Sequence, residues 1–214
     1  MKIKMRRLLC VVLCLLLGLM LCACASDAKL SESEISALRS RYPAMADTGN
    51  ESNTLICYKS ESFDEVKQTY QKWLGVVEAT VTGTDGSVLE IAPADGMAKE
   101  KLNTVFLKVH IDSVIAKQDD VDLSGDVTLY VGSQQYLGSE FHIEPGTKLV
   151  LGIYPLDMEL DLEKCPKDWG AAVHYSYYLT EDQHLISLYD QSGPAEKNGV
   201  TLNAFRSELK NLYR

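Results

Sequence analysis

The sequence predicts a mainly β domain with flanking helices, folded as a small antiparallel barrel or a strongly twisted sheet. From Gly75 onward, apolar and polar residues mostly alternate with a period of two, which is typical of half-buried strands. Turn residues divide this stretch into about six or seven short strands at hairpin-like spacing. A helical period of about 3.6 appears before Gly75 and again after Val200, so we expect helices to cover the open edges of the sheet.

The N-terminus has the composition of an export signal. Four basic residues lie within the first seven, and an apolar run follows from Leu8 to Ala25. No acidic residue occurs before Asp27. This order is that of a secretory signal peptide. An uncleaved membrane anchor is the alternative, because about eighteen apolar residues also reach the lower limit for a transmembrane helix.

The end of the apolar run, Leu21-Cys22-Ala23-Cys24, resembles the lipobox of bacterial lipoproteins. The resemblance implies that residues 1–23 are a lipoprotein signal peptide and that the Cys24 thiol receives a diacylglyceryl group. The mature protein would then be anchored in the cell membrane and face the extracellular side. Residues 24–30 are predicted to be the lipid-anchored tether, and residues 31–214 a single β-rich globular domain with N- and C-terminal helices.

The charge of the chain bears on its partners. Its 214 residues carry a net charge of −9, with 30 acidic against 21 basic residues. Loss of residues 1–23 removes four basic residues and no acid, which makes the mature charge −13. That sign excludes nucleic acid as an expected partner. It also repels an anionic bilayer, so the lipid on Cys24 is the predicted membrane contact.

Two helices are expected before the strands. Residues 31–43 begin with a capping box at Ser31 and Glu34, continue with apolar residues at helical spacing and end at Pro43. Residues 62–73 begin with a second capping box and carry an aromatic stripe that predicts a core-facing helix.

The strands follow in order along the chain. Turn residues at Thr84-Asp85-Gly86 predict a hairpin between the first two strands. An acidic turn is expected over residues 118–126, and further turns at 144–146 and 180–183. Thr201 is the predicted cap of a terminal helix. The expected strands are residues 77–81, 88–91, 105–111, 127–131, 149–153, 173–179 and 184–189.

This order resembles the oligonucleotide/oligosaccharide-binding (OB) barrel, and more narrowly its netrin and tissue-inhibitor version. The matching stretches are Phe106 to Val114, Gly125 to Val131 and Glu144 to Leu151, the last reading x-Pro-Gly-x-x-Leu-Val-Leu. The layout also looks like that of uncharacterised surface lipoproteins of Gram-positive bacteria, including the helix start at Gly199. The resemblance covers roughly residues 62 to 214. The netrin disulfide framework is absent, so it does not imply inhibitor activity.

The cysteines of the mature chain leave two alternatives open. Besides Cys24, the mature chain contains Cys57 and Cys165. In an exported domain such a pair is a candidate disulfide, which would close a loop of roughly a hundred residues. The alternative is two separate buried thiols.

The sequence predicts no catalytic residue, no metal ion and no cofactor. Residues 120–126 look like the first half of a calcium loop, but Val131 stands where the bidentate Glu is needed, which favours a simple acidic turn. The four histidines show no metal-ligand spacing, and no nucleophile or phosphate-binding motif is present.

The densest aromatic stretch, Val173 to Tyr178, is the candidate ligand platform. Alternation places Tyr175 and Tyr177 on one face of the strand and Tyr178 on the other. If one face meets solvent, its rings suit sugars or a protein partner. The alternative is a core strand whose tyrosine hydroxyls reach the rim.

These observations predict a non-enzymatic, lipid-anchored module that binds a surface protein, peptide or glycan. The first alternative is an exported hydrolase or metal-dependent enzyme that uses His174 and His184, which could approach each other across a hairpin. The second is a structural accessory to a membrane or wall complex.

Overall fold

The computed structural model describes residues 28–44, 74–91, 100–133, 142–156, 165–188 and 197–212. The export signal, Cys24, Cys57 and the helix predicted over residues 62–73 lie outside these ranges, so those predictions stand as they were made.

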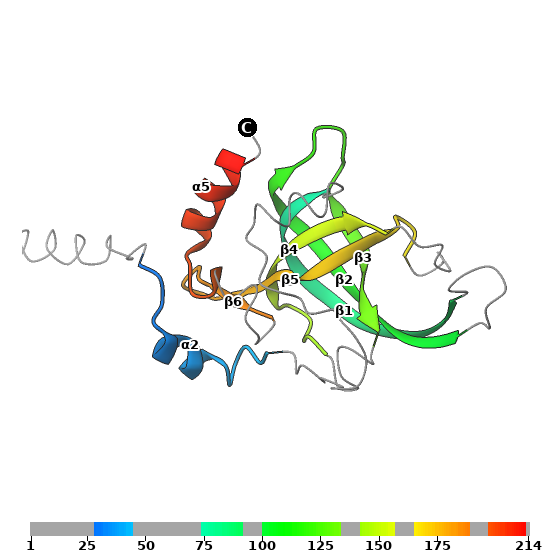
Figure 1. The fold of residues 1–214 in the computed structure, drawn as a ribbon, viewed down its shortest axis with the longest axis horizontal. Helices are drawn as coiled ribbons and strands as arrows, with labels where there is room; N and C mark the ends of the chain where they lie inside the picture. The colour runs from blue at the N-terminus through cyan, green and yellow to red at the C-terminus, as the bar shows by residue number, and fades with distance from the viewer. Residues whose placement is uncertain are drawn as a thin grey trace, which may run out of the picture.

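The described chain consists of six strands with one helix before them and one after them (Figure 1). The sequence patterns therefore placed both terminal helices and the run of strands in the right order. The elements are α2 (Glu32–Leu38), β1 (Gly75–Ile91), β2 (Glu100–Lys117), β3 (Gly125–Ser133), β4 (Lys148–Pro155), β5 (Trp169–Leu179), β6 (Leu185–Ser187) and α5 (Leu202–Leu212).

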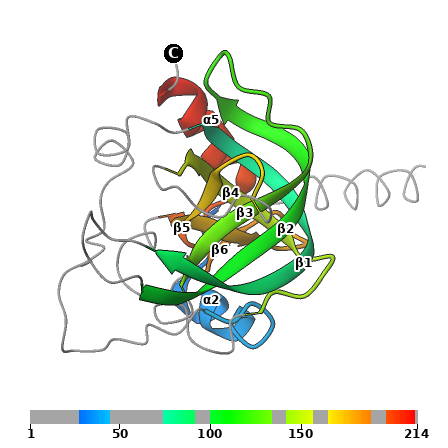
Figure 2. The ribbon, with the colours of Figure 1, turned by 90° about the vertical axis from the view of Figure 1, so that its right-hand side faces the viewer.

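The first five strands form a closed barrel. Their order in the sheet is β3-β2-β1-β4-β5, and β6 extends the sheet beyond β5. Neighbouring strands in this order run antiparallel, and a parallel pairing of β3 with β5 at Tyr130 and Gly170 closes the barrel. The curved strands wrap around one interior (Figure 2). This confirms the predicted mainly β fold, a small barrel with flanking helices.

Alternation of apolar residues creates the barrel interior. Val77, Ala79 and Val81 of β1 point inward, while Val76 points outward into a second cluster beneath α5. The interior cluster draws on all five barrel strands, so closing the sheet leaves one continuous apolar core. Its fully buried members include Val77, Ala79, Val109, Leu129, Leu149, Leu151 and Ile153.

The hairpin predicted at Thr84–Gly86 is wrong. β1 continues through these residues to Ile91, and they pair with Leu107, Phe106 and Val105 of β2. A register shift between Val81 and Gly83 bends the strand just before them. Because β2 is 18 residues long, it offers a partner to every one of these positions, and this pairing overrides their turn composition.

Two of the three predicted helix starts lie in the described residues, and both are confirmed. Ser31 accepts a hydrogen bond from the Glu34 backbone N–H, and the Glu34 carboxylate accepts one from the Ser31 N–H at 2.8 Å. At the other helix, the Ala204 N–H donates to Thr201 Oγ1 at 3.2 Å. Helix α2 is shorter than predicted, because it ends at Leu38 and the chain reaches Pro43 through a turn.

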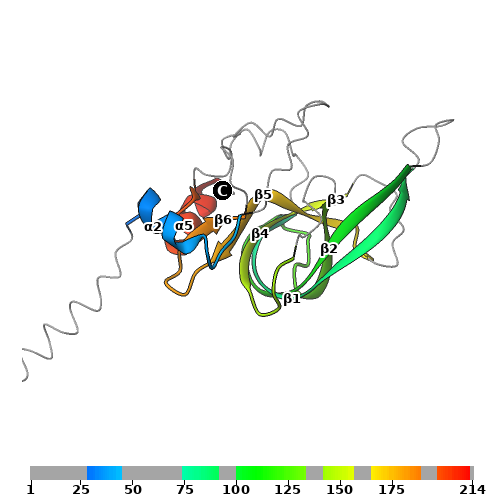
Figure 3. The same ribbon diagram turned by 90° about the horizontal axis from the view of Figure 1, so that it is seen from below.

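Residues 28–44, which we call the N-terminal strap, lie along β5, β6 and the start of α5 (Figure 3). The Leu30 N–H donates to the Gly199 carbonyl at 2.9 Å, and His184 Nε2 lies 3.3 Å from the Ala28 carbonyl. The described end of the predicted tether, residues 28–30, is therefore docked on the domain.

Within the described ranges, neither helix has the length and apolar character needed to cross a membrane.

Candidate functional site

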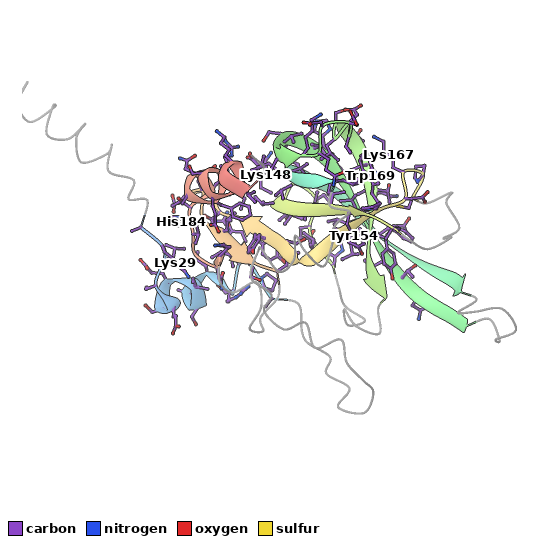
Figure 4. All side chains as sticks on the ribbon, turned by 45° about the horizontal axis from the view of Figure 1, so that its top comes forward. Lys29, Lys148, Tyr154, Lys167, Trp169 and His184 are labelled. Atoms are coloured by element: carbon purple, nitrogen blue, oxygen red, sulfur yellow. The ribbon has the colours of Figure 1, made fainter. Side chains whose placement is uncertain are left out.

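The strongest candidate site lies where β3 and β5 close the barrel. We call it the seam site. Figure 4 shows Tyr154, Lys167 and Trp169 at the same end of β4 and β5. Tyr130 belongs to it through its pairing with Gly170, and Asp168 lies between Lys167 and Trp169. The seam site consists of Tyr130, Tyr154, Lys167, Asp168, Trp169 and Gly170.

Gly170 lies at the centre of the seam site, where the absence of a side chain leaves room for a neighbouring ring. It pairs with Tyr154 of β4 on one side and with Tyr130 of β3 on the other. A Cβ at this position would lie 2.5 Å from Cζ of the Tyr154 ring and 2.7 Å from its hydroxyl. The ring of Tyr154 therefore occupies the space that any other residue at 170 would fill.

Trp169 brings a second ring to this end of the barrel. It is half-buried against the barrel interior, whereas Tyr154 packs with the cluster on the outside. Lys167 is exposed, and its Nζ lies 4.5 Å from the centroid of the Trp169 ring. This cation–π contact stabilises the half-buried ring.

Asp168 is held in a conformation that few non-glycine residues adopt. Its φ is 53°, in the left-handed region. Two backbone hydrogen bonds fix it there: its N–H donates to the Cys165 carbonyl at 3.0 Å, and its carbonyl accepts from the Leu156 N–H at 2.7 Å. Its Oδ1 is buried and has no hydrogen-bond partner among the described residues. Backbone strain and an unpaired buried oxygen together are typical of functional sites.

Cys165 lies beside the seam site as a free, buried thiol. Its Sγ is 3.3 Å from the carbonyl oxygens of both Thr128 and Trp169, to which the S–H can donate. Burial raises the pKa of this thiol above 9.0, and the charge of Asp168 adds to the rise, against opposing backbone hydrogen bonds. The thiol therefore stays protonated and is a poor nucleophile.

The structure has Cys165 as a free, buried thiol. Its side chain also packs with Phe106 in a small buried cluster. Because the other cysteine of the predicted pair is not described, the choice between a disulfide and two separate thiols stays a prediction. Cys57 itself lies outside the described residues.

The predicted tyrosine platform does not include Tyr177 or Tyr178, because both rings are buried. They are 0% and 5% exposed. Tyr177 packs against Phe205 of α5 with ring centroids 5.9 Å apart, and Tyr178 against Tyr42 of the strap at 5.5 Å. The two faces of β5 are thus covered by different elements, as the core-strand alternative expected. The side chain of Tyr175 is outside the described part of the structure.

The strand register does not set His174 and His184 opposite each other in the β5–β6 hairpin. The His184 carbonyl accepts from the Thr180 N–H, which sets these two residues opposite each other. His174 lies in a three-residue bulge of β5, between Ala172, paired with Gly152, and Ser176, paired with Leu151. Hence the register does not place His174 opposite His184. Among the described residues, no three His, Cys, Asp or Glu side chains are grouped as metal ligands.

The other histidines lie on the surface in acid–base pairs. His110 Nδ1 is 2.7 Å from Asp126 Oδ1, and His142 Nε2 is 3.4 Å from Glu144 Oε1. The calcium-like segment forms the turn between β2 and β3, as predicted, and the Ser124 hydroxyl donates to Asp122 at 2.8 Å within it. These contacts are local: the His110–Asp126 pair joins β2 and β3, and the other two lie within single connecting segments.

A polar ladder crosses the outside of the barrel. Lys148 of β4 donates to Thr80 of β1 at 2.6 Å and to Asp112 of β2 at 2.9 Å, and Thr80 also donates to Asp112. Burial alone would raise the pKa of Asp112. The hydrogen bonds from Thr80 and Lys148, with the charges of Lys148 and His110, outweigh burial and bring that pKa below 3.8.

Sequence reasoning missed Asp168 and Trp169 because the fifth barrel strand was expected to begin only at residue 173, and it missed Tyr154 because the expected strand before it ended at residue 153. One local signal was available: a tryptophan directly before a glycine at the start of a strand, in Asp168-Trp169-Gly170. A ring beside a glycine in a sheet often marks close approach of another side chain.

Comparison with known proteins adds no assignment to this geometry. No protein-family model, no curated protein and no solved structure matches the chain.

Proposed function

We propose that this chain is a lipid-anchored extracytoplasmic protein of the bacterial cell surface and that it acts there as a non-enzymatic binding module. Its seam site would receive a surface protein, peptide or glycan. Cys24 would carry the diacylglyceryl anchor.

The anchor is supported by the order of residues at the N-terminus. Basic residues, an apolar run and Leu21-Cys22-Ala23-Cys24 follow one another as in bacterial lipoproteins. A small residue before Cys24 admits a peptidase, and the cysteine thiolate can take up the lipid. Cys22 is preceded by Leu21 and lacks this context.

The test of the anchor is metabolic labelling with a fatty acid. We expect Cys24→Ser to abolish labelling and to release the protein from the membrane fraction. Cys22→Ser is the matched control, because it changes a cysteine of the same segment, and it should label like the wild type. Labelling that survives in Cys24→Ser would contradict the proposal.

The binding role is supported chiefly by the seam site. Half-buried Tyr and Trp side chains offer apolar area together with a polar edge, which is why these residues are enriched at interfaces. The unpaired Asp168 Oδ1 adds an acceptor that a ligand donor could satisfy after a small movement. Small barrels carry binding sites in many unrelated proteins, so the fold supports a binding role by analogy.

The cysteine and histidine side chains that could act in catalysis make contacts that hold the fold together. Cys165 is buried against two carbonyls, and His184 holds the strap through the Ala28 carbonyl. His110 is engaged with Asp126. These contacts favour a binding role over the alternative of an exported hydrolase.

The test of the binding role is capture of the partner by the intact surface protein, with cross-linking and mass spectrometry. We expect Trp169→Ala and Lys167→Ala to lower recovery of the partner at least about tenfold, a loss equivalent to about 1.4 kcal/mol. Thr82→Ala, an exposed change on β1, is the matched control. Equal recovery by Trp169→Ala, Lys167→Ala and Thr82→Ala would contradict a binding role for the seam site.

A further inference from the structure

We infer that the anchored domain stands directly on the bilayer, with its strap end toward the lipid headgroups and its seam site facing away from them. The strap end consists of the N-terminal strap, β6 and the turn at residues 180–183. This inference rests on the proposed anchor at Cys24 and adds an orientation to it.

The chain is already fixed to the domain at Ala28, close behind the anchor. The Ala28 carbonyl meets His184, and two residues later the Leu30 N–H donates to Gly199. A Cβ at Gly199 would lie only 3.0 Å from Ile35 and 3.1 Å from Leu30, so the strap lies directly on the backbone there. Figure 4 places Lys29 and His184 together at this end of the domain.

Little chain is left between the anchor and this docking point. Only Ala25, Ser26 and Asp27 separate Cys24 from Ala28. Four Cα-to-Cα steps span at most about 14 Å when fully extended. If the Cys24 lipid lies in the membrane, Ala28 is therefore held within roughly that distance of the headgroups.

The strap does not provide a hinge after Ala28. Arg39 donates to the Ser187 carbonyl at 2.6 Å, and the Tyr178 hydroxyl donates to the Pro43 carbonyl at 3.1 Å. Arg41 forms a 2.5 Å ion pair with Glu181 in the turn after β5. Because contacts follow the strap along its length, the domain moves with the anchored residues as one body.

The seam site lies at the other end of β5. This strand begins at Trp169 in the seam site and ends at Leu179, next to the strap (Figures 1 and 3). Gly170 pairs with Tyr154 and Tyr178 with Leu149, which are five residues apart on β4. At about 3.3 Å per residue, roughly 17 Å of strand separates the seam site from the strap end.

The distribution of charge agrees with this upright arrangement. The chain from Cys24 onward carries −13, so an anionic bilayer repels the domain as a whole and disfavours its lying flat on the headgroups. The strap end is less acidic than this total. Its four acids, Glu32, Glu34, Glu181 and Asp182, are accompanied by three basic residues, Lys29, Arg39 and Arg41, and Arg41 pairs with Glu181. The short connection therefore holds near the membrane an end whose charges largely cancel.

The test is energy transfer from the protein to dye-labelled lipid headgroups in anionic vesicles. The chain 24–214 with Cys57→Ser retains every described residue, and Cys24 is coupled to a maleimide phospholipid. A fluorophore is attached through a click-reactive amino acid at Ser36, which is exposed on α2, or at Lys167, which is exposed in the seam site.

Given about 17 Å of strand between the two ends, we expect transfer from position 36 to exceed that from position 167 about threefold. A flexible Gly/Ser linker of about twenty residues after Asp27 should remove the difference, because its r.m.s. span is about 25 Å. Equal transfer from both positions on the short connection, or a difference that the linker leaves intact, would overturn the orientation. Because the lipid is added chemically, this result is independent of the labelling test, which decides whether cells lipidate Cys24.

Discussion

The barrel interior and the layer outside it are held together by different kinds of contact. The interior is an apolar cluster to which all five strands contribute. In the outer layer of strap, β6 and α5, helix α5 packs on a smaller apolar cluster. The strap contributes only Tyr42 to the buried part of the interior cluster, and it depends also on single directed bonds such as Arg39 to the Ser187 carbonyl. The interior therefore determines whether the chain folds, whereas the outer layer determines where its two ends lie.

The largest expected effect comes from the interior. Leu129 of β3 is completely buried in the barrel cluster. Leu129→Ala removes apolar contacts and leaves a cavity, which we expect to lower the free energy of unfolding by about 3 kcal/mol. Urea unfolding followed by circular dichroism measures the loss. Hydrogen exchange should quicken in all barrel strands together, and a loss confined to β3 would contradict a single cooperative interior.

The sequence predicted the parts of the fold that depend on near neighbours. The caps at Ser31 and Thr201 were predicted correctly, and so were the inward faces of the strands at Val77 and Val109. A cap or a strand face is decided within a few residues of the chain. The hairpin at Thr84–Gly86 was wrong, because pairing with β2 at Leu107 to Val105 decided the conformation there. Turn composition is a weak preference that a long partner strand overrides.

The candidate sites were also predicted poorly where they depend on residues that are distant in the sequence. The tyrosine platform assumed that one face of β5 meets solvent, but α5 covers Tyr177 and the strap covers Tyr178. Both elements are distant in the sequence. The seam site depends on the pairing of Tyr130 with Gly170, forty residues apart, and on the positive φ of Asp168. The pairing cannot be read from a local pattern, since closure of the barrel creates it. The conformation of Asp168 depends in part on its hydrogen bond with Leu156, which is twelve residues away.

A smaller and more local effect is expected in the outer layer. Tyr178→Phe removes the hydroxyl that donates to the Pro43 carbonyl but keeps the ring against Tyr42. We expect a loss of about 1 kcal/mol, the usual net value of one such hydrogen bond. Hydrogen exchange should quicken at the amides of residues 30–44 and stay unchanged in β1 to β3. Faster exchange in the barrel strands would show that the two regions are not energetically separate.

The smallest expected effect concerns the polar ladder on the outside of the barrel. Asp112→Asn removes the charge that Lys148 and Thr80 hold, and we expect it to cost less than about 1 kcal/mol at neutral pH, since the pair is largely solvated. The pKa of Asp112 is lower in the folded chain than its ordinary value of 3.8. Its contribution is therefore complete above pH 3.8 and disappears as the pH falls through the folded pKa.

Urea midpoints of the wild type and Asp112→Asn should therefore converge on acidification from neutral pH to below 3.8. Asp119→Asn, a change at an exposed acid in the turn after β2, is the control and should differ little from the wild type throughout. A gap between wild type and Asp112→Asn that persists in acid would mean that Asp112 acts through packing and not through charge. In that case packing, and not the contact with Lys148, would account for the stabilising effect of Asp112 on the outside of the barrel.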